Sequence, residues 1–135
     1  MDAAKILIVD DEKFVRRTIS RVLSSEGFAT FEASNGPDAL RMAQEQSFDL
    51  MLLDIVMDGM DGFQVIRTLR DLGILLPVFV LSGRQADNDK ILALGIGADD
   101  YITKPFSLSV LRARVNTQLR KAESLQAHTS ASVYK

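Results

Sequence analysis

Residues 50–54 read LMLLD, a continuous apolar run that ends in a carboxylate and is followed by turn-forming residues. The same arrangement occurs earlier, where residues 5–9, KILIV, lead directly into Asp10 and Asp11. Apolar runs of this length are typical of strands that are buried on both faces of a parallel sheet. Open parallel sheets bind ligands beyond the carboxyl ends of their strands, so we expect Asp10, Asp11 and Asp54 to meet at one edge.

Three clustered carboxylates repel one another, and they stay ionised together only if a cation compensates their charge. All-oxygen ligands favour Mg²⁺ or a similar hard cation. The alternative is that each acid only caps the helix after its strand, as aspartate commonly does. Capping would explain one aspartate, whereas three at matching strand ends favour a metal site.

Strand-like apolar runs alternate with amphipathic helical stretches five times along the chain. This alternation predicts an α/β fold with a parallel sheet covered by helices on both faces. The expected strands are residues 5–9, 29–33, 50–54, 77–82 and 101–103. The expected helices begin near Lys13, at Gly36-Pro37, after Gly62, near Asp87 and near Ser107.

The length of 135 residues suits a single domain, which we expect over residues 1–122. Residues 123–135 are expected to form the end of the last helix and a polar tail or linker. No apolar run reaches the length of a membrane span, and the first strand begins too early for a signal peptide. The composition therefore predicts a cytoplasmic domain with no membrane contact.

Other function classes are disfavoured by composition. The net charge of −2 argues against direct nucleic-acid binding, which requires a basic face. The absence of cysteine excludes disulfides and a thiolate nucleophile. The single histidine, His128, lies in the polar tail, so histidine-based catalysis and a multi-histidine metal site are not expected.

The predicted strands deliver a specific set of side chains to one edge of the sheet. After the acids, the fourth strand ends at Ser82 and the fifth is followed by Lys104. An aspartate can act as a nucleophile and form an acyl phosphate. A lysine and a metal ion can neutralise the charge of a transferring phosphoryl group, and a hydroxyl can donate a hydrogen bond to it. The pattern predicts phosphoryl transfer onto a carboxylate.

Four motifs occur together in a fixed order. They are IVDDE at residues 8–12, LD at 53–54 with Met57 and MDG at 60–62, LS at 81–82, and GADDYITKPF at 97–106. On these motifs the chain resembles, over about residues 4–122, the receiver domain of two-component response regulators. The resemblance implies a flavodoxin-like (βα)5 fold with a five-stranded parallel sheet of strand order 2-1-3-4-5.

The resemblance also implies roles for the strand-end residues. Asp54 would be the phosphoacceptor, and Lys104 and Ser82 would contact the phosphoryl oxygens. Asp11, Asp54 and the Val56 carbonyl would bind Mg²⁺ (or Mn²⁺), with Asp10 helping through water. The Lys104–Pro105 peptide bond would be cis.

As a function, the resemblance implies a phosphorylation-dependent signalling switch rather than a turnover enzyme. The phosphodonor would be a sensor histidine kinase or a histidine phosphotransfer protein, and the changed surface would regulate a partner or an output domain. Tyr101 would move with Ser82 as the switch; the alternative is a half-buried strand aromatic. Phe14, with Thr18 and Phe106, would contact the donor; ordinary partial burial of Phe14 is the alternative.

Several charged residues stay open to more than one interpretation. The arginines Arg16, Arg17 and Arg21 are most simply a solvated face. Arg114 and Lys121 would be able to pair with Asp99 or Asp100 across a homodimer formed through the last two helices. Surface pairs of this kind contribute only ~0.2–1 kcal/mol, so they do not establish dimerisation. Asp58 stands where the family usually has proline. Its charge would either raise metal affinity or slow the approach of an anionic donor, or it would face solvent without consequence, which is the outcome we expect.

Two other functions are weighed against the switch. One is a receiver-like module that only docks partners, which would not need the full set of strand-end side chains. The other is a phosphohydrolase with an aspartyl nucleophile resembling haloacid dehalogenases, but Val56 occupies the position where those enzymes place a second aspartate. The cognate kinase, the output, the oligomeric state and the phosphate lifetime are not predicted by the sequence.

Overall fold

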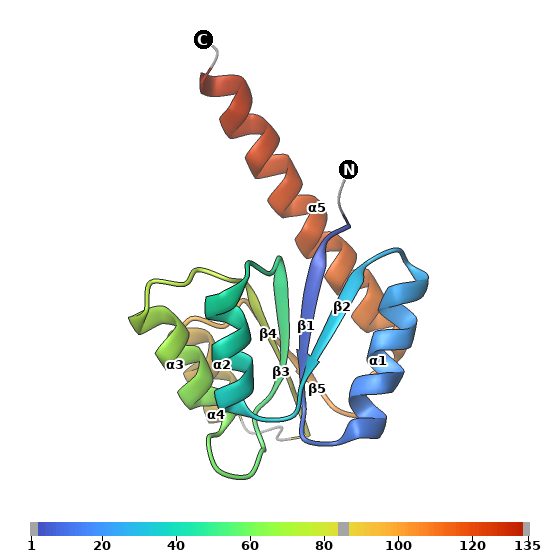
Figure 1. Ribbon diagram of the computed structural model, residues 1–135, viewed down its shortest axis with the longest axis vertical. Coiled ribbons are helices and arrows are strands. Elements are labelled where there is room, and N and C mark those ends of the chain that lie inside the picture. Colours follow the sequence, from blue (N-terminus) through green and yellow to red (C-terminus); the bar gives the residue numbers. More distant parts are fainter. Residues whose placement is uncertain (1–2, 84–86, 134–135) are drawn as a thin grey trace.

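The chain forms one five-stranded parallel sheet with helices on both faces (Figure 1). The computed structural model describes the backbone of residues 3–83 and 87–133, and the side chains of residues 3–83 and 88–122. The strands, in the spatial order β2-β1-β3-β4-β5, are β1 (Lys5–Val9), β2 (Ala29–Ala33), β3 (Leu50–Asp54), β4 (Val78–Ser82) and β5 (Asp100–Thr103). The helices are α1 (Lys13–Ser25), α2 (Gly36–Glu45), α3 (Gly62–Asp71), α4 (Asp87–Gly95) and α5 (Leu108–Val133).

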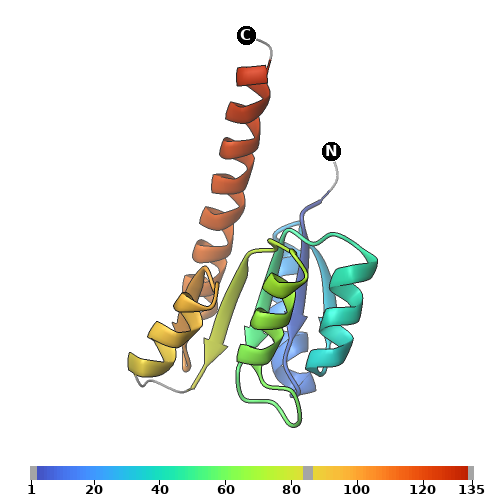
Figure 2. The same cartoon turned by 90° about the vertical axis from the view of Figure 1, so that its left-hand side faces the viewer.

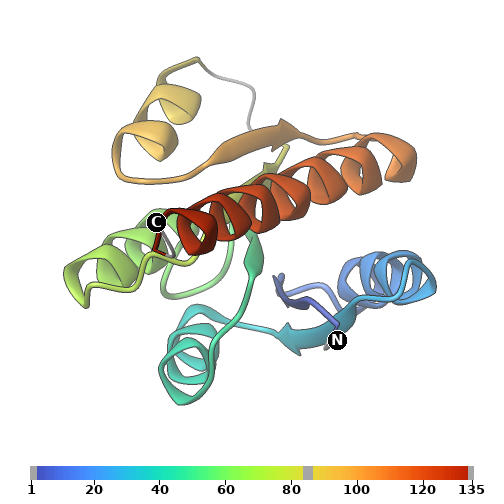
Figure 3. The same cartoon turned by 90° about the horizontal axis from the view of Figure 1, so that it is seen from above.

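This arrangement confirms the predicted flavodoxin-like fold and its strand order. Side chains alternate along β1 and β3, so each strand supplies apolar groups to both faces of the sheet. One core packs under α2, α3 and α4, and the other packs under α1 and α5 (Figure 3). The two-sided burial explains why residues 6–9 of β1 and residues 50–53 of β3 are continuous apolar runs.

The strand register places the functional edge. Val9 of β1 pairs with Leu53 of β3, and Asp54 pairs with Leu81 of β4. Ser82, the last residue of β4, pairs with Thr103 of β5. The carboxyl ends of β1, β3, β4 and β5 therefore lie at the same level, and the residues that follow these strands share one edge.

We expected the end of the last helix within residues 123–135, and the α5 backbone runs to Val133 and projects beyond the sheet (Figure 2). Among the described side chains of α5, which end at residue 122, the buried ones are Leu111, Val115 and Leu119. The side chain of His128 lies outside the described part, and a linker or tail role for residues 123–135 stays a prediction. None of the helices in the described backbone combines the length and apolar character needed to cross a bilayer.

Candidate functional site

Three carboxylates meet at the carboxyl edge of the sheet, as the sequence predicts. Asp54 ends β3, and Asp10 and Asp11 follow the neighbouring strand β1. One carboxylate oxygen from each residue lies within 4.8 Å of the other two. Asp10 and Asp54 are buried, while Asp11 is exposed. The cluster therefore has two desolvated acids and one that faces solvent.

The helix-capping alternative is wrong for these acids. The N-cap of α1 is Glu12 and the N-cap of α3 is Asp61, which forms a capping box with Gln64. Instead, Asp10 Oδ1 accepts a hydrogen bond from the Glu12 N–H at 2.9 Å, and Asp54 Oδ1 accepts one from the Val56 N–H at 3.2 Å. These local bonds orient the two carboxylates without ending a helix.

Lys104 brings the opposite charge to the cluster. Its ammonium Nζ lies 3.3 Å from Asp10 Oδ2 and 3.7 Å from Asp54 Oδ2. The Lys104–Pro105 bond is cis, as the resemblance implies. The backbone N–H of Lys104 donates to the Ser82 carbonyl at 2.7 Å, so the hydrogen bonding between β4 and β5 extends to Lys104. The ammonium thus contacts the carboxylates from two different strands.

Burial is the largest influence on the pKa of Asp54 and raises it above its ordinary value. The Lys104 ammonium and the Val56 N–H act in the opposite direction, whereas the charges of Asp10 and Asp11 raise the pKa further. The Lys104 ammonium contacts two of the three carboxylates, those of Asp10 and Asp54, and it does not fully offset the effect of burial on Asp54.

This donor set fits a hard divalent cation. It offers carboxylate oxygens from three residues in close proximity, which is the ligand type that Mg²⁺ prefers. A bound cation would also supply the positive charge that burial of Asp54 and Asp10 demands. Val56 directly adjoins the cluster through its N–H, and its carbonyl as a further ligand stays a prediction.

Ser82 and Tyr101, the expected switch pair, both lie inside the protein. Ser82 is fully buried at the end of β4, next to the strand that carries Asp54. Tyr101 is 9% exposed and belongs to the core that also contains Val80 and Ala93. Tyr101 is therefore more buried than the alternative of a half-buried strand aromatic supposes, and its role in the switch stays a prediction.

Phe14 is 82% exposed, so the alternative of ordinary partial burial is wrong for this residue. Thr18 lies one turn further along α1 and donates its hydroxyl hydrogen bond to the Phe14 carbonyl at 2.8 Å. A groove of about 520 Å³ runs between α1 and the segment after β5. Its lining is Glu12, Phe14, Val15, Thr18, Ile19, Lys104, Pro105, Phe106 and Leu108. All three predicted donor contacts are therefore on one surface that reaches Lys104.

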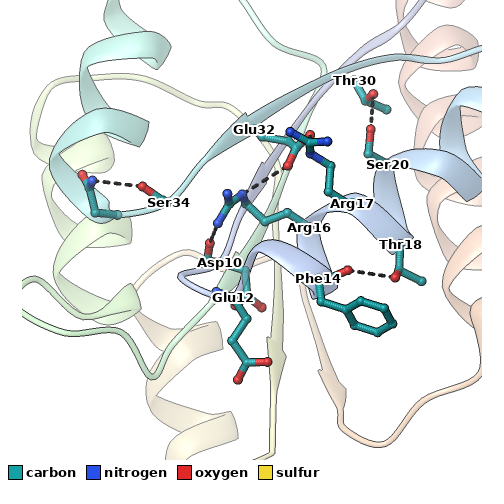
Figure 4. Close-up of polar contacts among 11 residues, drawn as sticks. Asp10, Glu12, Phe14, Arg16, Arg17, Thr18, Ser20, Thr30, Glu32 and Ser34 are labelled. Carbon is teal, nitrogen blue, oxygen red and sulfur yellow. Dashed lines mark hydrogen bonds and ion pairs between the residues drawn. The ribbon is translucent and has the colours of Figure 1, made fainter.

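One residue beside the cluster was not predicted. The expectation of a solvated arginine face is wrong for Arg16, whose side chain is only 13% exposed, compared with 61% for Arg17. Arg16 Nη1 donates to the backbone carbonyl of Asp10 at 2.7 Å, and its Nε donates to Glu32 at 3.2 Å (Figure 4). The sequence carries no signal that separates Arg16 from its neighbour.

The charged residues of the last two helices form pairs within the chain. Arg114 Nη1 lies 3.0 Å from both carboxylate oxygens of Asp100. Asp99 accepts a hydrogen bond from the Val78 N–H at 2.8 Å and lies 3.6 Å from Arg70. These acids therefore already have partners, and a homodimer through the last two helices stays a prediction. Asp58 is exposed, in agreement with the expectation that it faces solvent.

The fold and this edge define a class of protein: a flavodoxin-like α/β domain with an acidic cluster, a lysine and a buried hydroxyl at the carboxyl ends of its strands. The chain matches the family model described as response regulator receiver domain over residues 6–116, and it belongs to that family. Domains of this family are phosphorylation switches on an aspartate in two-component signalling, and they interact with histidine kinases or phosphotransfer proteins.

Individual relatives agree with the family. The chain is 39% identical over 119 residues to PhoP, the alkaline phosphatase synthesis transcriptional regulatory protein of Bacillus subtilis, covering 88% of this chain and 50% of PhoP. It is 39% identical over 137 residues to a probable transcriptional regulatory protein of Picosynechococcus, covering 96% of this chain and 55% of that protein. The chain thus spans about half the length of these relatives.

A solved structure shares the fold. The receiver domain of the Francisella response regulator 1452 superposes with a TM-score of 0.85 at 34% identity. The match covers 88% of this chain and 98% of the Francisella domain. The resemblance to a receiver domain therefore holds for both the sequence and the three-dimensional arrangement.

Proposed function

We propose that Asp54 is the aspartate that accepts the phosphoryl group. The observation that carries this proposal is the position of its carboxylate, which is buried beside Asp10 and Asp11 and lies 3.7 Å from the Lys104 ammonium. An Asp54 oxygen would attack the phosphorus atom of the donor. The bond from phosphorus to the donor's imidazole nitrogen would break, and the imidazole would leave with the electron pair. The product is an acyl phosphate on Asp54.

Asp10, Asp11 and Asp54 would hold Mg²⁺ (or Mn²⁺), with the Val56 carbonyl as an additional ligand. When bound, the cation supplies positive charge to the phosphoryl oxygens during transfer. Support for this assignment comes from the three carboxylate oxygens within 4.8 Å of one another and from the raised pKa of Asp54, which burial causes.

Lys104 and Ser82 would act on the transferred group. The ammonium already contacts Asp54 and would follow the negative charge onto the phosphoryl oxygens. The Ser82 hydroxyl lies on the neighbouring strand and would donate a hydrogen bond to the same group. Tyr101 is buried on β5, and its rearrangement together with Ser82 would report phosphorylation to the surface of α4 and α5.

The phosphodonor would be a sensor histidine kinase or a histidine phosphotransfer protein that docks on Phe14, Thr18 and Phe106. The exposed phenyl ring of Phe14 and a groove that reaches Lys104 support this surface. The domain would act in the cytoplasm as a regulator and not as an enzyme that turns over an external substrate. Because the relatives are transcriptional regulatory proteins of about twice this length, the output would be a partner or a further domain.

The test is chemical phosphorylation. The protein is incubated with Mg²⁺ and a small acyl phosphate, and its intact mass is measured over time. We expect one added phosphoryl group in wild type and in Asp58→Asn, which changes an exposed acid four residues further on. We expect none in Asp54→Asn. Equal labelling of wild type and Asp54→Asn would refute the assignment, and no labelling of wild type would favour a module that only docks partners.

A further inference from the structure

We infer that Arg16 is a positioning residue for the acidic pair at the end of β1. This inference rests on the proposed function, because it concerns the binding of a divalent cation by Asp10, Asp11 and Asp54. It adds a side chain that touches neither the cation nor the phosphoryl group. Its role is to orient the peptide group that joins Asp10 to Asp11.

Asp10 is held by groups from three directions. Its backbone N–H donates to the Ala33 carbonyl at 3.2 Å, and its Oδ1 accepts from the Glu12 N–H at 2.9 Å. Its backbone carbonyl lies beyond the last residue of β1 and accepts from Arg16 Nη1 at 2.7 Å (Figure 4). With only 3% of the residue exposed, this carbonyl depends on a protein donor more than on water.

The direction of this carbonyl determines where Asp11 goes. The peptide group is planar, so fixing the Asp10 carbonyl also fixes the N–H of Asp11 and the direction of its Cα. Asp11 is exposed and stands at the bend that follows β1. Arg16 therefore constrains the one acid of the cluster that burial does not hold in place.

Arg16 is itself fixed by Glu32 of β2. The Nε of Arg16 lies 3.2 Å from Glu32 Oε1, while the Nη1 of the same group contacts Asp10. A planar guanidinium can donate in these two directions at once, which a lysine ammonium on a flexible stem does less well. Arg17 also pairs with Glu32, at 3.3 Å, but its side chain is 61% exposed.

Arg17 is thus a matched control. Both arginines carry the same charge, lie next to each other on α1 and share Glu32, but the bond to the Asp10 carbonyl belongs to Arg16. In Figure 4 the Phe14 ring points away from the Arg16 guanidinium, so changing Arg16 leaves the proposed donor surface in place.

The sign of the effect separates positioning from electrostatics. The positive charge of Arg16 repels a divalent cation at the three carboxylates. If charge alone mattered, removing it should strengthen cation binding. Loss of a positioning bond should weaken it, because the ligands are then no longer held in the binding geometry. Mutation of residues that orient metal ligands typically weakens metal binding by about 10–100-fold.

The experiment is a Mg²⁺ titration of the folded protein, followed by the NMR shift of the Val56 backbone amide. We expect Arg16→Met to weaken Mg²⁺ binding about tenfold. We expect Arg17→Met to stay within about twofold of wild type, since it removes only an exposed pair. The melting temperature of each variant is recorded without Mg²⁺, so that a loss of stability is separated from a loss of affinity.

Three results would overturn the inference. The first is that Arg16→Met binds Mg²⁺ as tightly as wild type or more tightly, and the second is that both variants lose affinity equally. If wild type does not bind Mg²⁺ at all, the inference fails together with the proposed metal site. Should Arg16→Met not fold, Arg16→Lys replaces it: at least about threefold weaker binding supports positioning, and unchanged binding contradicts it.

Discussion

The two edges of the sheet use acidic residues in opposite ways. At the carboxyl edge, Asp54 is buried among other carboxylates and shares the Lys104 ammonium with Asp10. At the amino edge, Asp99 is 40% exposed, accepts from the Val78 N–H at 2.8 Å and pairs with Arg70 at 3.6 Å. The carboxyl edge holds acids for which we propose a further cation, whereas the amino edge holds an acid that is paired with Arg70 and the Val78 N–H.

Arg70 shows what the amino edge gains. Its Nη1 donates to the carbonyls of Ile74 at 2.7 Å and Leu76 at 2.8 Å, and its Nη2 donates to that of Gly97 at 2.7 Å. These bonds join the loop before β4 to the loop before β5. The comparison indicates that the side chains at the amino edge stabilise the fold. The buried acids at the carboxyl edge destabilise it, and they form the site proposed for phosphorylation.

The largest expected effect breaks the amino edge. Arg70→Met leaves three backbone carbonyls without their donor and should lower the free energy of unfolding by about 3 kcal/mol. Its Mg²⁺ affinity should stay within about twofold of wild type, because Arg70 lies at the opposite edge of the sheet from the acidic cluster. Urea denaturation measures the free energy of unfolding, and a Mg²⁺ titration measures the affinity. Arg67→Met, at an exposed position of the same helix, is the control, and equal stability of the two variants would contradict this account.

A second variant disturbs the carboxyl edge without changing its charge. A Cβ at Gly62 would lie 2.8 Å from both the Asp54 carbonyl oxygen and the Ile55 Cα, and these backbone atoms cannot easily move away. Gly62→Ala should therefore destabilise the protein by about 2 kcal/mol and slow phosphorylation of Asp54. Gly95→Ala has open space around the added methyl group and should change neither quantity. Wild-type labelling rates in Gly62→Ala would show that the Asp54 backbone is free to shift.

A third variant is expected to stabilise the protein. Because burial raises the pKa of Asp54 in the folded state, its ionised form destabilises the fold at neutral pH. Asp54→Asn should raise the melting temperature without Mg²⁺ at pH 7. This increase in melting temperature should shrink as the pH falls from the raised pKa of Asp54 in the folded protein toward the ordinary aspartate value of about 3.9. Below that value Asp54 is protonated in both the folded and the unfolded protein. A lower melting temperature for Asp54→Asn at pH 7 would mean that Lys104 compensates the buried charge fully.

The smallest expected effect on stability concerns two exposed apolar residues at opposite edges. Phe14 is 82% exposed and Leu75 is 83% exposed, so replacing either by alanine should change stability by no more than about 0.5 kcal/mol. Phosphotransfer from a histidine phosphotransfer protein should slow in Phe14→Ala and not in Leu75→Ala. Labelling by a small acyl phosphate should stay the same in both. Equal rates of phosphotransfer from the phosphotransfer protein to Phe14→Ala and Leu75→Ala would contradict a role for Phe14 in donor binding.

The sequence predicted the sheet and its acidic edge because both follow from local patterns. Apolar runs that end in Asp10 or Asp54 specify a buried strand and the end of that strand at once, and parallel pairing brings such ends together. The order of the strands came from the resemblance, since periodicity alone does not say which strands are neighbours.

Other features depend on distances that no local pattern contains. Arg16 and Arg17 differ by one position on α1, and only packing against β2 decides which of them is 13% exposed and reaches the Asp10 carbonyl. The pair of Arg114 and Asp100 likewise forms within one chain because α5 packs beside β5. The sequence predicted the charges but could not distinguish a contact within the chain from one across a dimer.

The most direct test of the central claim locates the phosphoryl group itself. Wild-type protein is phosphorylated with Mg²⁺ and a small acyl phosphate and is then treated with borohydride, which reduces an acyl phosphate and converts the aspartate to homoserine. Peptide mass spectrometry identifies the converted position. We expect homoserine at residue 54 and unchanged aspartate at residues 10, 11 and 58. Homoserine at any of these other positions, with Asp54 intact, would contradict that claim.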